Sequence, residues 1–154
     1  MNKTGILLIF LAFVASAFTA ALFIKGEPAA IVSNSQVMTL QDGQQLYQQN
    51  CASCHGIDLQ GEPNWRSAKA DGSFPAPPHD ETGHTWHHDD AYLFNYTKFG
   101  GQGIATMMGL DNPNSRMPAF QDSLTDAQIL VILDYIKSTW PQSVREIQAA
   151  RNAE

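Results

Sequence analysis

Cys51-Ala52-Ser53-Cys54-His55 is the stretch that decides the fold of this chain, because it has the C-x-x-C-H spacing of a haem-attachment site. Two thiols at this spacing reach two vinyl groups on one porphyrin edge, and the next residue places an imidazole beneath the iron. The chain has no further cysteine, so a zinc site would lack a second cysteine pair. A thioredoxin-like pair would need a βαβ context that the sequence does not offer. We therefore predict one covalent c-type haem held by Cys51 and Cys54, with His55 as an axial ligand.

The residues before this motif have helical periodicity. A helix is predicted to start between Thr39 and Asp42, and its apolar face brings both cysteines to one side. The positions on this face recur at three- and four-residue steps and are Leu40, Gly43, Leu46, Tyr47, Cys51 and Cys54.

The residues after the motif alternate between long loops and short helices. Residues 56–88 are dense in Gly, Pro, Asp and His, and this composition predicts a loop. A loop of this length is uncommon in a compact domain unless it wraps something or carries function. A short helix is expected over 91–99, ended by Gly100-Gly101, and residues 100–124 are expected to be irregular. A capping-box pattern from Thr125 to Gln128 starts a last helix, which Pro141 stops. Three or four helices with so much loop need a large apolar body to pack around.

The N-terminal residues form a separate segment. Residues 5–24 are an uncharged run between Lys3 and Lys25, and their 20 positions are long enough to span a bilayer as a helix. The alternative is a secretory signal cleaved after the small-x-small triplet at 15–17. Both readings export the rest of the chain, and we favour the retained anchor over residues 1–25.

The remaining organisation follows from composition. Residues 26–35 predict a linker, 36–142 a single all-α domain, and 143–154 a C-terminal tail. The formal net charge is −6, and no basic stretch exists that could neutralise a run of phosphates. Nucleic-acid binding is excluded.

Four segments in order resemble a class I monohaem cytochrome c, and in detail a group of small membrane-anchored bacterial cytochromes c. They are GQQLY before the attachment site, PHDETGHTWHHDD, RMPAF, and LTDAQILVILDYIKSTWP near the end. The resemblance implies an all-α fold of three to four helices and long loops wrapped round one haem. It also implies that Gly43 and Tyr135 mark the contact between the first and last helices.

The resemblance further implies the ligands of the iron. Met117 would be the sixth ligand, a soft thioether that favours reduced iron. Met107 and Met108 are competitors that more often serve as packing residues. The second ring nitrogen of His55 would be held by a prolyl carbonyl, for which Pro63 stands in the expected place. Pro75 and Pro77 are the alternatives.

The surroundings of the haem are predicted less sharply. We expect Trp65, Arg66 and Arg116 to reach the haem propionates. A solvated surface position suits the two arginines equally. Four histidines lie within ten positions, at 79, 84, 87 and 88. A copper or zinc site is conceivable there, and the competing interpretation is a loop that covers the haem edge.

These features together predict a one-electron carrier rather than an enzyme, because a six-coordinate iron leaves no position for substrate. A haem peroxidase-like enzyme and a copper-handling protein that uses the His79 to His88 loop are the alternatives. The predicted location is the periplasmic side of a bacterial cytoplasmic membrane. The predicted partners are membrane redox complexes, with a quinol–cytochrome oxidoreductase or another dehydrogenase as donor and a terminal oxidase as acceptor.

Overall fold

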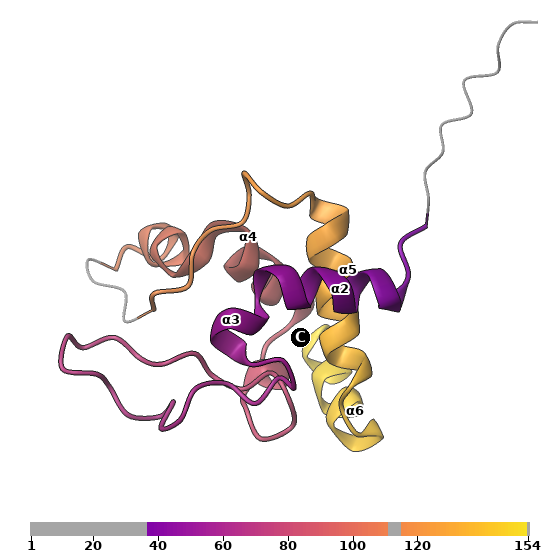
Figure 1. Ribbon diagram of the computed structural model, residues 1–154, viewed down its shortest axis with the longest axis horizontal. Coiled ribbons are helices and arrows are strands. Elements are labelled where there is room, and N and C mark those ends of the chain that lie inside the picture. Colours follow the sequence, from indigo (N-terminus) through magenta and orange to yellow (C-terminus); the bar gives the residue numbers. More distant parts are fainter. Residues whose placement is uncertain (1–36, 111–114, 154) are drawn as a thin grey trace, which may run out of the picture. The chain divides into compact units, whose positions relative to one another are not determined.

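The computed structural model describes residues 37–110 and 115–153 (Figure 1). The predicted anchor at 5–24 and linker at 26–35 lie outside these residues. Over the two ranges described, no helix is long and apolar enough to cross a membrane. These same ranges form five α-helices and one short 3₁₀ helix, with no strand. The all-α prediction is confirmed, with one helix more than expected.

The first helix in the described part of the chain, α2 (Leu40–Asn50), starts where the sequence predicts. Thr39 is its N-cap, and Thr39 and Asp42 form a reciprocal capping box that satisfies two backbone N–H groups at the helix start. The chain then turns at Cys51 into the single-turn helix α3 (Ala52–His55). Gly56 ends α3 with a positive φ of 81°. The Tyr47 hydroxyl donates to the Gly56 carbonyl over 2.9 Å, so the buried ring ties the two helices together.

Helix α2 crosses α5 (Asp126–Ser138), and this crossing is the main contact between helices (Figure 1). Gly43 lies at the crossing, where an added Cβ would overlap the Val131 carbonyl oxygen and lie 3.0 Å from the Tyr135 Cβ. The predicted approach of Gly43 and Tyr135 is therefore confirmed. Apolar residues of α5 complete the core beside Tyr47 and Trp140; those with the least exposure are Ile129, Ile132 and Ile136.

Helix α4 (Asp90–Met107) is longer than predicted. Gly100 has φ 69° and interrupts the helix, but the chain resumes helical geometry and continues to Met107. The expectation that residues 100–124 are irregular is wrong for the first part of that stretch. The pair of glycines produces a kink here because only the first of them leaves the helical conformation.

The C-terminal residues predicted as a tail form helix α6 (Gln142–Arg151), which packs against the 3₁₀ helix η1 (Thr85–His87). Gln148 is 4% exposed and donates to the His88 carbonyl and to Asp90. The Asn152 side chain also bonds Asp90, both at the carboxylate and at the backbone N–H. The tail prediction missed this helix because Gln148 is buried through partners about 60 positions away.

Replacing Gly43 by alanine should destabilise the folded protein by about 1–3 kcal/mol, because the new methyl group overpacks the crossing of α2 and α5. Chemical denaturation followed by circular dichroism measures the change. Gln48→Ala, at an exposed position of the same helix, should change stability by no more than about 0.5 kcal/mol. Equal effects of the two substitutions would contradict the assigned crossing.

Candidate haem-binding site

A cavity of about 770 Å³ lies between the helices and the loops. Cys51, Cys54 and His55 are all among its lining residues. Apolar lining residues from α4 and α5 are Leu93, Ile104, Ile132, Leu133 and Ile136, and the loops contribute further apolar residues such as Phe74 and Phe120. One cavity thus joins the predicted attachment residues to a large apolar surface.

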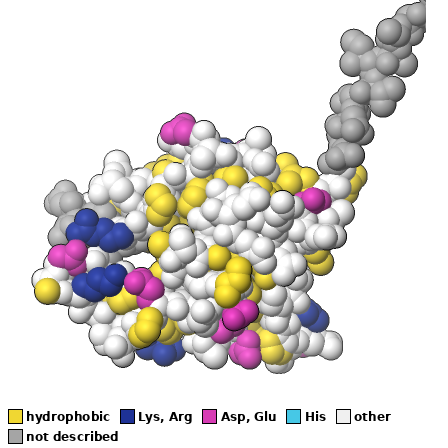
Figure 2. Space-filling model, viewed as in Figure 1, with side chains coloured by type: hydrophobic (Ala, Val, Ile, Leu, Met, Phe, Trp, Pro, Cys, Tyr) yellow, Lys and Arg dark blue, Asp and Glu magenta, His cyan; other side chains and the backbone are white. Residues whose placement is uncertain are grey.

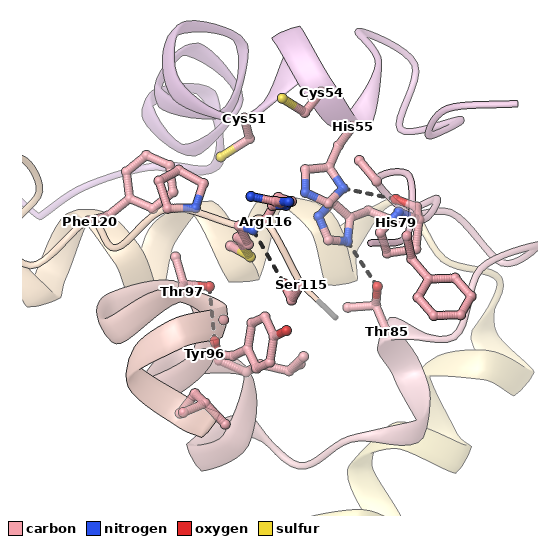
Figure 3. Close-up of a pocket in the computed structure, with 18 of the residues that line it drawn as sticks. Cys51, Cys54, His55, His79, Thr85, Tyr96, Thr97, Ser115, Arg116 and Phe120 are labelled. Carbon is pink, nitrogen blue, oxygen red and sulfur yellow. Dashed lines mark hydrogen bonds between the residues drawn. The ribbon is translucent and has the colours of Figure 1, made fainter. Parts of the chain in front are cut away.

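Cys51 lies at the turn between α2 and α3, and Cys54 and His55 belong to α3. Figure 3 shows Cys51, Cys54 and His55 close together on these purple helices. Cys51 is buried and Cys54 is exposed. Burial raises the pKa of the Cys51 thiol to about 11, which keeps it protonated at neutral pH. Of the two thiols, Cys54 is the one that solvent reaches.

One hydrogen bond holds the imidazole ring of His55, and that bond determines which ring nitrogen is free. Its Nδ1 lies 2.8 Å from the Pro77 carbonyl oxygen. A carbonyl can only accept, so Nδ1 carries the proton and Nε2 keeps its lone pair. Burial lowers the pKa of His55, so the ring is neutral and suited to bind a metal.

The predicted partner of His55, Pro63, is wrong, and one of the alternatives, Pro77, takes its place. Pro63 is exposed and does not line the cavity. The chain first turns outward through residues 62–75 and then returns. The two ends of this excursion are joined by a hydrogen bond from the Glu62 N–H to the Ala76 carbonyl. The return, at residues 76–79, is the part that reaches His55.

Met117 lines the cavity from a segment that rests on α4. Its carbonyl accepts a hydrogen bond from the Gly101 N–H over 3.0 Å, just beyond the kink. At Gly100 an added Cβ would lie 2.7 Å from the Ala119 nitrogen, so the two backbones approach too closely for any side chain. Gly100 and Gly101 are therefore required for the Met117 segment to dock.

The two competing methionines differ from Met117. Met107 is 62% exposed and is not among the cavity-lining residues. Met108 is 65% exposed and touches the cavity at its edge. Met117 is more shielded than either of them.

The histidine-rich loop divides into two groups. His79, His84 and His88 line the cavity, whereas His87 stacks on Trp86 with ring centroids 3.7 Å apart and does not line it. Within the described ranges, no group of three or more His, Cys, Asp or Glu residues is arranged to hold a metal ion. The loop is a cavity wall in this structure.

A row of rings along this wall was not predicted from the sequence. His84, His88, Tyr92 and Tyr96, at every fourth position, all line the cavity. Successive ring centroids are 5.6, 4.4 and 5.6 Å apart. The row runs from a loop into α4, and its constant four-residue spacing is the signal in the sequence that could have found it.

Two of the three residues expected near the propionates lie elsewhere. Arg66 stacks over Trp65, with its guanidinium carbon 4.0 Å from the ring centroid, and neither residue lines the cavity. Arg116 does line the cavity and forms an ion pair with Asp71 at 2.9 Å. That pair joins the loop at 71–73 to the segment that carries Met117.

The cavity fits a covalently bound haem. It offers two cysteines for thioether bonds, one neutral imidazole with a free Nε2, and a thioether on a separate segment. A cytochrome c family model matches residues 40–140, which is well over half of the chain. The chain belongs to the cytochrome c family. Cytochromes c are haem-based electron carriers, and Cys51 and Cys54 are consistent with covalent haem c. No curated protein and no solved structure gives a significant match to the chain.

In this cytochrome c, Asp71 should titrate far below an ordinary aspartate. Hydrogen bonds from Ser73, and more weakly the Arg116 guanidinium, lower the pKa of its carboxyl from 3.8 to about 2. A lowered pKa means that these contacts stabilise the fold above about pH 4 and are lost as the pH falls through 2. Carboxyl NMR titration measures the midpoint.

Ser73→Ala should raise this midpoint more than Arg116→Ala, because the hydrogen bond from the Ser73 hydroxyl is the largest single cause, while the backbone N–H of residue 73 still donates to Asp71 in this variant. Arg66→Ala, which removes an arginine that stacks on Trp65, should leave the midpoint unchanged. A larger rise in Arg116→Ala than in Ser73→Ala would contradict the assigned order.

Proposed function

We propose that this cytochrome c is a one-electron carrier whose haem iron has His55 and Met117 as axial ligands. The observation that carries the proposal is the hydrogen bond from His55 Nδ1 to the Pro77 carbonyl, which leaves Nε2 as the ligand atom in a cavity that Met117 also lines. Bound haem supplies an iron that changes by one electron. His55 and Met117 would then hold the iron, and the apolar lining of the cavity would surround it.

The apolar lining and the polar row have different roles in this proposal. Apolar residues of α4 and α5 would pack against the bound porphyrin, which would favour the less charged, reduced iron. The row from His84 to Tyr96 presents imidazole and phenol groups, which are suitable hydrogen-bond donors for the haem carboxylates.

We propose further that partners dock through apolar contacts or through basic groups of their own. The lysines in the described part of the chain are all in ion pairs, at Lys69, Lys98 and Lys137, so they form no free basic ring. On the face in Figure 2, the basic side chains at the left of the view lie beside acidic ones. Phe74, Met108 and Leu110 line the cavity and are 41–65% exposed, which gives its edge an apolar rim.

The location and the partners of this carrier are proposals from the sequence. We propose that residues 5–24 anchor the chain in a bacterial cytoplasmic membrane, with the cytochrome domain on the periplasmic side. Such an anchor would hold the domain at high effective concentration near membrane redox complexes. A quinol–cytochrome oxidoreductase or another dehydrogenase would be the donor, and a terminal oxidase the acceptor.

Haem attachment is tested by extraction with acid acetone. The protein made with a working haem-attachment system should retain one haem per chain after denaturation, measured by mass spectrometry. The double variant Cys51→Ser, Cys54→Ser should lose all of it, because no thioether bond remains. Ser53→Ala, which changes the exposed residue between the cysteines, should retain haem fully. Complete extraction from the unmodified protein would overturn covalent attachment.

Axial ligation is tested by the absorbance band that a methionine sulfur gives on ferric haem. Met117→Ala should abolish this band and lower the midpoint potential, because a thioether ligand favours reduced iron. Met107→Ala and Met108→Ala are matched controls and should leave both quantities nearly unchanged. If the band survives in Met117→Ala and is lost in either control, Met117 is not the ligand.

A further inference from the structure

His79 lines the cavity, and hydrogen bonds hold both its backbone N–H and its backbone carbonyl. Its N–H donates to the Leu59 carbonyl over 2.8 Å, and its carbonyl accepts from the Trp140 Nε1 over 2.7 Å. Leu59 and Trp140 are both buried core residues. The backbone of His79 is therefore held in place by residues of the buried core, although His79 itself belongs to a loop.

The His79 ring lies flat against the ring of His55. The two ring centroids are 4.0 Å apart and the planes differ by 24°, which is a stacked arrangement. Figure 3 shows the two imidazoles side by side, each with a dashed hydrogen bond leading away from the other. Tyr47 closes another side of the His79 ring with an edge contact at 6.2 Å.

A hydrogen bond holds the His79 ring in this orientation. Its Nδ1 lies 2.8 Å from the Thr85 Oγ1, and Thr85 is only 6% exposed. The Thr85 hydroxyl in turn lies 3.5 Å from the Pro78 carbonyl. Thr85 itself sits in η1, so the orientation of the ring depends on a residue of a different element.

The two contacts of His55 constrain different motions of its ring. The bond from Nδ1 to Pro77 fixes one edge of the ring but permits the plane to rock about that edge. A flat neighbour at 4.0 Å opposes this rocking, because any tilt drives one ring into the other. Groups beyond the ligand that orient it in this way also tune the metal.

We propose that His79 is a positioning residue that fixes the plane of the His55 imidazole by stacking, and that Thr85 anchors it. The inference rests on the proposed role of His55 as an axial ligand. It adds that the flatness of the residue at position 79, and its attachment to Thr85, determine the orientation of the ligand about the iron–nitrogen bond.

The test compares four variants of the haem-loaded full chain by electron paramagnetic resonance of the ferric state and by midpoint potential. His79→Leu removes the flat ring and should broaden or split the low-spin signal and shift the potential. His79→Phe keeps a flat ring but loses the hydrogen bond to Thr85, so its signal should be sharper than that of His79→Leu and should resemble that of Thr85→Val. Thr85→Val removes the anchor at similar side-chain volume and should change the signal in the same direction as His79→Leu, by less. His87→Ala, in the same loop but outside the cavity lining, should match the unmodified protein.

A folded His79→Leu variant with the unmodified signal and potential would overturn the proposal. If that variant does not fold, as judged by circular dichroism, Thr85→Val decides, and an unchanged signal in it overturns the proposal equally. Failure of the proposed function is a distinct result, because the unmodified protein would then lack retained haem or its methionine band.

Discussion

The hydrogen bond between His55 Nδ1 and the Pro77 carbonyl is the interaction on which the rest of this structure depends. It joins the helix that carries the cysteines to the far end of the loop that follows, across 22 positions of sequence. It also selects the tautomer in which Nε2 is free for a metal. Because both residues line the cavity, this one hydrogen bond holds the returning loop segment against the cavity and fixes the ring of His55.

Close backbone approach is the second requirement of the fold, and glycine provides it in two places. At Gly43 the absent side chain allows α2 to reach the backbone of α5. At Gly100 the absent side chain and the left-handed conformation together allow the Met117 segment to rest on α4. The first contact builds the scaffold behind the cavity, and the second places a thioether on its lining.

The loop with four histidines gains its order from outside the loop. Helix α6, which begins after the last residue matched by the family model, holds the segment from His88 to Asp90 through Gln148 and Asn152. Lys137 of α5 adds a third contact to Asp90. Each of these groups is polar, and Gln148 is buried with its hydrogen bonds satisfied, so the contacts specify one arrangement of the wall.

Short-range chemistry made part of the molecule predictable from sequence alone. The spacing of Cys51, Cys54 and His55 specifies a haem-attachment turn within five residues. Apolar periodicity places a helix start between Thr39 and Asp42, and the capping box at Thr125 specifies where α5 begins. The contact of Gly43 with Tyr135 was also anticipated, from the resemblance to a known family. None of these needs the path of a long loop.

What only the tertiary structure decided depends on where distant segments return. Four prolines follow the attachment site within the loop, at 63, 75, 77 and 78, and their local sequences do not distinguish which carbonyl comes back to His55. The stacking of His79 on that ring, and the burial of Gln148 in a segment that looks like a polar tail, likewise depend on partners far along the chain. The neighbours of a residue in sequence determine its local conformational propensity. They do not determine which distant segment packs against it, and that packing decided the places of Pro77, His79 and Gln148.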